Sequence, residues 1–123
     1  MIKMVFRASV FTLLAVCLVA GQTSKTKSSS AASFVGKWEV GLGVGGQTFY
    51  ITLDKDGKAT KSHGSPNGTW TVFGDEARIT WSDGWHDVIR RAGNKWEKAA
   101  YAPGKSFSDL PDNIAGATRT EPL

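Results

Sequence analysis

Cysteine and histidine are nearly absent from this chain. Its 123 residues include one cysteine, Cys17, and two histidines, His63 and His86. A single cysteine cannot form a disulfide within the chain, and a structural zinc site needs four ligands that cysteine and histidine mostly supply. Disulfide staples and a structural zinc centre are therefore excluded as the basis of the fold. We expect neither a bound metal nor a cofactor.

Clusters of positive charge are missing as well. The net charge is +4, but the longest basic run is Arg90-Arg91. A surface that follows a nucleic-acid backbone needs a cluster of basic residues. Removing Lys3 and Arg7, which precede an apolar N-terminal segment, from the 15 basic residues leaves 13 against 11 acidic residues, a net charge of +2. We therefore expect no nucleic-acid partner.

A long membrane-spanning segment is also missing. The apolar run from Ala8 to Ala20 contains no charged residue and follows Lys3 and Arg7. It is shorter than the roughly 20 apolar residues that a helix needs to cross a bilayer. A basic start followed by a short apolar segment is typical of a secretory signal peptide. We expect residues 1–21 to be cleaved after Gly21, giving an exported protein, secreted or periplasmic, with no stable membrane span.

Cys17 raises the alternative of a bacterial lipoprotein anchor. Lipoprotein signals place a small residue before the modified cysteine, whereas this chain has the branched Val16. The apolar residues also continue past Cys17. We therefore favour removal of Cys17 with the signal peptide over its lipidation.

The composition divides the rest of the chain into three parts. Residues 22–33 are rich in serine, threonine and lysine and predict a flexible leader. Residues 34–101 contain the periodic apolar positions and predict a single domain that resembles a β-barrel. Residues 102–123 hold three of the four prolines and only scattered apolar residues, Phe107, Leu110 and Ile114. This composition predicts an irregular C-terminal tail, either mobile or folded back as a flap.

An alternation of apolar and polar residues is the strongest structural signal in residues 34–101. Ala77, Ile79 and Trp81 share one parity, and hairpin-type turns at Gly74-Asp75 and Asp83-Gly84 flank this stretch. Repeated along the chain, the pattern predicts an all-β, antiparallel up-and-down meander of about seven short strands, closed into a small barrel. The same parity places five residues in the structural core: Trp38, Ile51, Trp70, Ile79 and Trp81.

No catalytic residues are predicted. Ser82, His86 and Asp87 have the residue types of a hydrolase triad, but the side chains of neighbouring residues on a strand point to opposite faces. His86 would therefore lack an orienting carboxylate. The segment from Asp54 to Gly57 has the composition of a hairpin turn, and its spacing lacks the bidentate glutamate of a calcium loop.

Three aromatic or imidazole side chains are candidates for contact with a ligand or partner. Trp85 directly follows the turn at Asp83-Gly84, where side chains tend to be exposed. His86 is its neighbour, and Tyr50 lies on the polar face of its strand. Large aromatic residues at such positions often form the centre of an interface.

The sequence from Gly36 to about Arg91 resembles the calycin group, which includes lipocalins, avidins and bacterial metalloprotease-inhibitor barrels. The resemblance is carried by Gly36-Lys37-Trp38 on the first strand and by the meander that follows. It implies a binding barrel in which a late basic residue, Arg90 or Arg91, packs on Trp38. It does not imply a particular ligand.

These observations together predict an exported, non-enzymatic binding or interaction module. Its partner would be a small apolar molecule, a glycan or another protein. A protease inhibitor of the calycin type, in which residues 22–33 enter the protease cleft, is the alternative. An enzyme is the third choice.

Overall fold

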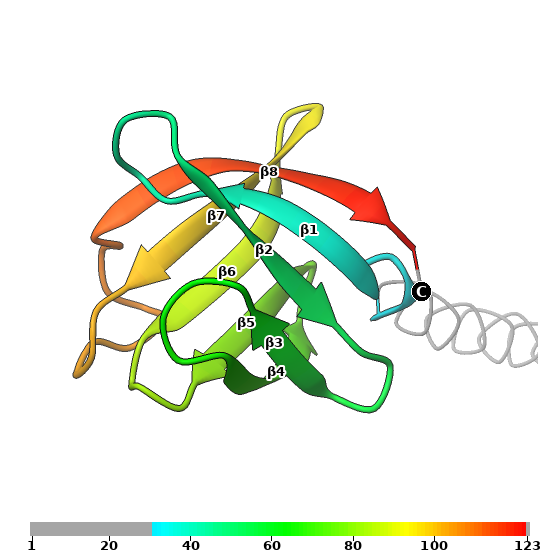
Figure 1. Ribbon diagram of the computed structural model, residues 1–123, viewed down its shortest axis with the longest axis horizontal. Helices are drawn as coiled ribbons and strands as arrows, with labels where there is room; N and C mark the ends of the chain where they lie inside the picture. Colours follow the sequence, from blue (N-terminus) through cyan, green and yellow to red (C-terminus); the bar gives the residue numbers. More distant parts are fainter. Residues whose placement is uncertain (1–30, 123) are drawn as a thin grey trace, which may run out of the picture. The chain divides into compact units, whose positions relative to one another are not determined.

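Eight strands form a closed antiparallel barrel in the computed structural model, which describes residues 31–122 (Figure 1). The predicted all-β meander is confirmed, with eight strands in place of about seven. The strands are β1 (Gly36–Gly41), β2 (Thr48–Leu53), β3 (Lys58–Lys61), β4 (Asn67–Phe73), β5 (Glu76–Trp81), β6 (His86–Ala92), β7 (Lys95–Tyr101) and β8 (Asn113–Glu121). Each strand pairs with its neighbour in the chain, and β8 pairs with β1 to close the barrel. The predicted signal peptide, Cys17 and most of the leader lie outside the described residues.

β8 is the strand that the sequence pattern does not predict. The expectation of an irregular tail over residues 102–123 is wrong for Asn113–Glu121, which pairs with β7 on one side and β1 on the other. Ala117 is the one buried residue of this strand, so an apolar alternation is missing from its sequence. Backbone pairing with two neighbours holds β8 in place, and that pairing leaves no trace in the hydropathy pattern.

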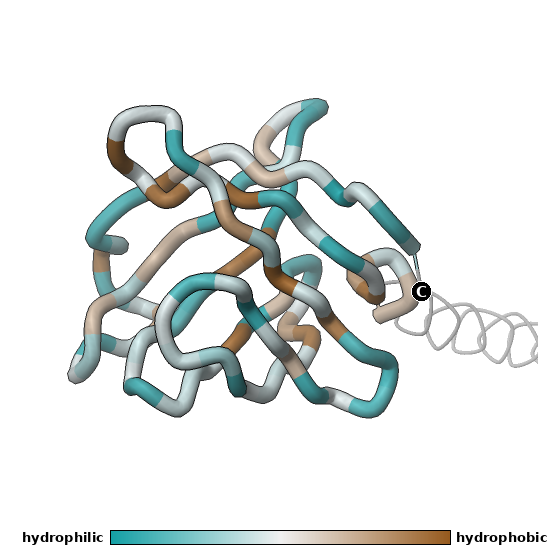
Figure 2. Tube along the Cα trace, viewed as in Figure 1, coloured by the Kyte–Doolittle hydropathy of each residue, from teal (hydrophilic) through white to brown (hydrophobic). Residues whose placement is uncertain are grey.

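The barrel interior is packed with the aromatic and branched residues that alternate along the strands. Hydrophobic and hydrophilic residues succeed one another along the chain in Figure 2, as a sheet with one buried face requires. The five residues placed in the core by parity are all buried: Trp38, Ile51, Trp70, Ile79 and Trp81. A large aromatic side chain removes roughly 150–250 Å² from water, which lets a small domain without disulfides build a core.

The end of the barrel where the chain enters β1 is filled by an aromatic cluster. Phe34 and Trp38 both meet Trp96 edge to face, with ring centroids 5.5 Å and 5.2 Å away. The indole N–H of Trp38 donates to the carbonyl oxygen of Phe34 at 2.9 Å. Elsewhere in the core, the indole N–H of Trp70 donates to the carbonyl oxygen of Asp54 at 2.7 Å. Both buried indoles therefore use backbone carbonyls as partners, as buried tryptophans require.

The basic residue that ties the first strand to the last is Arg119. It lies opposite Trp38 in the β1–β8 register, and its Nη1 donates to the carbonyl oxygens of Ser33 and Val35 at 3.0 Å and 3.1 Å. Arg119 thereby fixes the entry of the chain into β1.

The resemblance to calycins suggested Arg90 or Arg91 as the basic residue that packs on Trp38, and the structure places both elsewhere. Arg90 Nε donates to Glu97 at 2.8 Å. Arg91 lies over the ring of Trp96, 4.8 Å from its centroid. The strand that supplies the arginine nearest to Trp38 in register, β8, was missing from the expected set of strands.

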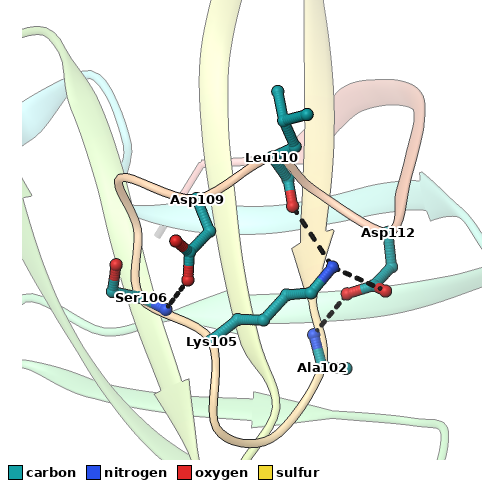
Figure 3. A network of polar contacts seen from close by, with 6 residues as sticks. All are labelled: Ala102, Lys105, Ser106, Asp109, Leu110 and Asp112. Carbon is teal, nitrogen blue, oxygen red and sulfur yellow. Dashed lines mark hydrogen bonds and ion pairs between the residues drawn. The ribbon is translucent and has the colours of Figure 1, made fainter.

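The connection between β7 and β8, residues 102–112, is an ordered loop held by its own polar contacts (Figure 3). The Asp112 carboxylate accepts from the Ala102 N–H at 2.7 Å and pairs with Lys105 at 3.0 Å. The N–H of Ser106 donates to Asp109 at 2.7 Å. The Ala102 N–H and Lys105 hold the pKa of Asp112 below its usual value, because both favour the charged form. The loop is irregular, as expected, but closed on itself.

The apolar residues of the tail do not plug the barrel. Phe107 packs on the outer face of the sheet, stacked on His86 with centroids 5.1 Å apart and edge-on to Tyr101 at 5.9 Å. Leu110 and Ile114 are exposed, Leu110 to 84%. The loop thus covers the outside of β6 and β7. Within residues 31–122 no helix is long and apolar enough to span a bilayer.

Ending the chain at Tyr101 tests the role of β8. The truncation leaves the edges of β1 and β7 unpaired and uncovers the aromatic cluster, so we expect the cooperative unfolding transition to be lost and a hydrophobic dye to bind. Urea unfolding followed by tryptophan fluorescence measures this. A chain ending at Pro122 keeps β8 and is the control. A wild-type midpoint in the chain that ends at Tyr101 would contradict the assignment of β8 as the closing strand.

Candidate functional site

A polar cavity of about 210 Å³ occupies the end of the barrel opposite the aromatic cluster. At this end lie the connections β1–β2, β3–β4, β5–β6 and β7–β8 (Figure 1). Its lining contains both apolar and charged side chains: Leu42, Phe49, Lys61, His63, Gly64, Asp83, Trp85, Asp87, Lys98, Ala100 and Asn113. The barrel interior is therefore divided into an apolar half and a polar mouth.

Strand alternation explains why charged side chains point into the barrel. Asp87 shares its parity on β6 with buried Ile89, and Lys98 shares its parity on β7 with Trp96 and Ala100. The register pairs Asp87 with Ala100 and Ile89 with Lys98. Asp87 and Lys98 are therefore diagonal neighbours on the same inner face, a placement that separates two residues by roughly 7–8 Å.

Asp87 is 5% exposed, and a hydrogen bond holds its carboxyl group in place. The indole N–H of Trp81 donates to its Oδ2 at 2.8 Å. Burial raises the pKa of Asp87 above its ordinary value, and the effect of burial outweighs the nearby Lys98, the Trp81 hydrogen bond and Lys61, which lower it. The cavity thus stabilises the protonated, neutral form of this carboxyl group.

Lys98 is 2% exposed and lies on the adjacent strand. Its ammonium nitrogen sits 5.0 Å from the ring centroid of Phe49. Among the residues that the structure describes, none forms a hydrogen bond or ion pair with this nitrogen. Burial lowers the pKa of Lys98, and the charge of Asp87 only partly opposes this. The cavity therefore also stabilises the neutral form of the amine.

Lys61 and Asp83 form the second charged pair of the mouth, nearer its rim. Their Nζ and Oδ2 atoms are 3.4 Å apart, and the Lys61 ammonium lies 4.5 Å from the ring centroid of Trp81. Asp83 Oδ1 also accepts the N–H of Trp85 at 3.1 Å, which fixes the β5–β6 turn. Lys61 and Asp83 thus form an ion pair with each other, whereas no salt bridge joins Asp87 and Lys98.

Asn113 adds a further polar group at the start of β8. Its Oδ1 is buried and has no hydrogen-bond partner among the described residues. Gly43, with φ of +98°, packs against it, and a Cβ at this position would lie 2.9 Å from the Asn113 Cγ. The β1–β2 connection thus packs against the Asn113 amide group at the cavity wall. The Oδ1 of this group remains an acceptor without a hydrogen-bond partner among the described residues.

Of the three residues predicted to contact a ligand or partner, the structure places one in the cavity. Trp85 lines it and is 36% exposed. His86 lies on the outer face of β6 beneath Phe107, and Tyr50 lies on the outer face of β2, with the Lys37 ammonium 4.8 Å from its ring centroid. These three side chains do not converge on a common site.

Sequence reasoning missed Asp87, Lys98, Lys61 and Asn113 as members of a site. A usable signal was present for two of them. Lys98 shares its parity with Trp96, and Asp87 shares its parity with Ile89, so each is a charged residue at a position that the pattern assigns to the core. Asn113 could not be found in this way because β8 has no apolar alternation.

Comparisons with models of known protein families, with curated proteins and with solved structures found no match for this chain. Within residues 31–122, no three His, Cys, Asp or Glu side chains come together in a way that could hold a metal ion. The site must therefore be interpreted from its own chemistry. An acid, an amine and an unpaired acceptor surround a small space with aromatic walls, an arrangement suited to holding a polar molecule.

Replacing Asp87 with Asn tests the effect of burial on this carboxyl group. At pH values below the ordinary pKa of 3.8 the folded and unfolded states both hold the proton, so the raised pKa has no effect on stability. As the pH rises through the folded pKa, the unfolded chain has already released its proton, and the wild-type protein loses stability. The asparagine side chain of the variant does not titrate and can still accept the Trp81 N–H. We therefore expect Asp87→Asn to gain stability relative to wild type between pH 3 and pH 7.

Urea midpoints of both proteins across this pH range measure the difference. Asp112→Asn, a change at a carboxyl group with a lowered pKa, is the control and should show the opposite sign. A difference between Asp87→Asn and wild type that does not vary with pH would contradict the account.

Proposed function

We propose that this protein is an exported, non-enzymatic, calycin-like barrel that binds a small polar molecule in its mouth. The observation that carries the proposal is Lys98, a lysine buried in the barrel without a bonding partner among the described residues and directed at the cavity. Lysine is almost never fully buried unless it is paired. A ligand that accepts a hydrogen bond would provide the missing partner.

Stability alone gives no reason for the charged residues of the mouth. Burying an ionisable group without good pairing costs free energy, and an apolar residue of similar size is often neutral or stabilising in its place. Asp87 and Lys98 are both buried, yet no salt bridge within the described chain joins them. Groups whose pKa values are displaced in opposite directions inside a cavity are typical of functional sites.

The size of the cavity limits the ligand. At about 30 Å³ per water molecule, a space of about 210 Å³ holds about seven waters. This is below the usual range for drug-sized ligands, about 300–1,000 Å³. The proposed ligand is therefore small, on the order of ten non-hydrogen atoms, with polar groups toward Lys98, Asp87 and Asn113 and an apolar part against Phe49 or Trp85.

The calycin likeness rests on the up-and-down order of eight strands and on Trp38, which is buried on β1 near the closed end. The likeness suggests a binding barrel, and the cavity lies at the end of this barrel opposite the aromatic cluster. The protease-inhibitor alternative depends on residues 22–33, most of which lie outside the described residues, so it stays a prediction from the sequence.

An amide NMR titration with a set of small acids, alcohols, sugars and carbonyl compounds tests the proposal. We expect at least one compound to shift resonances of Gly64, Trp85, Asp87, Lys98 and Asn113 together. Ala100→Leu fills the cavity from β7 and should abolish these shifts, because Ala100 lines the space. Thr60→Leu, on the exposed face of β3, is the matched control and should bind as wild type does. Shifts that persist in Ala100→Leu would place the binding elsewhere and contradict the proposal.

A further inference from the structure

The amine of Lys98 has the surroundings of a nucleophile. It is buried, it borders a cavity, and no residue of the described chain accepts a hydrogen bond from it. Lysines become nucleophilic when burial leaves a fraction of the amine uncharged. The lowered pKa of Lys98 acts in that direction.

A carboxyl group lies on the strand next to this amine and lines the same cavity. Asp87 and Lys98 interact electrostatically but form no hydrogen bond, as expected for diagonal neighbours on adjacent strands. Trp81 fixes Asp87 through Oδ2. Burial raises the pKa of Asp87, so its carboxyl group holds a proton more readily than an exposed one. A ligand in the cavity would therefore be bordered by both the amine and the acid.

We propose that the ligand of this cavity carries an aldehyde group and that Lys98 captures it reversibly as an imine, with Asp87 transferring the protons. The inference rests on the proposed function, because it names the ligand class of the same cavity. It extends that function because the ligand would form a covalent bond with Lys98.

The reaction balances without an oxidant or reductant. The Nζ lone pair attacks the carbonyl carbon, a C–N bond forms, and the oxygen takes a proton from Asp87. The Asp87 carboxylate then removes a proton from nitrogen and returns it to the hydroxyl group, which leaves as water when the C–O bond breaks. The products are a protonated imine on Lys98, the Asp87 carboxylate and one water molecule. The imine cation and the carboxylate remain in electrostatic contact inside the cavity.

The other charged groups of the mouth favour Lys98 over Lys61 as the reacting amine. Lys61 already has partners within the protein, because it is paired with Asp83 at 3.4 Å and lies over the ring of Trp81. His63 lines the rim, with its ring 5.5 Å from that of Phe49. Lys95, at the start of the same strand as Lys98, is exposed and does not line this cavity.

Reductive trapping of benzaldehyde on the intact exported chain tests the inference. The protein is incubated at neutral pH with benzaldehyde and cyanoborohydride, which converts an imine to a stable secondary amine. Intact mass and peptide mapping then give the rate of benzyl addition at each lysine. We expect Lys98 to react faster than Lys95, because burial lowers the pKa of Lys98 and so leaves more of its amine uncharged.

Lys98→Arg keeps a positive charge and should lose the fast addition, whereas Lys95→Arg on the same strand should retain it. Asp87→Asn should slow the addition at Lys98 by about a hundredfold or more, because it removes the proton donor. The comparison of Lys98 with Lys95 within the wild-type protein needs no variant to fold. Equal rates at these two lysines would overturn the inference.

Benzyl alcohol and benzoate separate failure of the inference from failure of the proposed function. Both lack an aldehyde, so neither forms an imine. If either shifts the cavity resonances while benzaldehyde adds no faster at Lys98 than at Lys95, the cavity binds its ligand without covalent chemistry and the inference is overturned. If no compound, benzaldehyde included, shifts the cavity resonances, both the inference and the proposed function are overturned.

Discussion

The pairing of β8 with both β1 and β7 is the constraint on which the rest of the structure depends. Seven strands in up-and-down order leave two open edges, and only the eighth strand converts them into a closed wall. Closing the barrel creates an interior, and this interior shields the aromatic cluster from solvent. Burial in this interior raises the pKa of Asp87 and lowers the pKa of Lys98. The candidate site therefore depends on a strand that contributes almost no buried side chain of its own.

The interior has two chemically different halves. At the end where the chain enters β1, Phe34, Trp38 and Trp96 pack edge to face and fill the barrel. Trp81 lies where the two halves meet. Its ring is buried in the core, and its N–H donates to Asp87 in the polar half. Replacing buried charged groups such as Asp87 and Lys98 with apolar residues of similar size is often neutral or stabilising. The polar half is the part of the barrel for which we propose ligand binding.

Much of the fold could be predicted from the sequence, because strand alternation is a local property. The parity of Trp38, Ile51, Trp70, Ile79 and Trp81 correctly placed each of them inside the barrel. The eighth strand could not be predicted in the same way, because its position is fixed by backbone pairing with β1 and β7 and not by an apolar pattern of its own. The site was harder still. Trp85 was predicted from its position after a turn, but the proximity of Asp87 to Lys98 becomes visible only once the register of β6 and β7 is known.

The central claim is that Asp87 and Lys98 are retained for ligand binding at a cost in stability. The double variant Asp87→Asn/Lys98→Met removes both charges, keeps an acceptor for the Trp81 N–H and preserves the volume of the lysine stem. Urea unfolding at neutral pH compares its free energy of unfolding with that of wild type. The account predicts a double variant that is at least as stable as wild type, and up to about 4 kcal/mol more stable. A double variant that is less stable than wild type would show that the two charges serve the fold and would contradict the account.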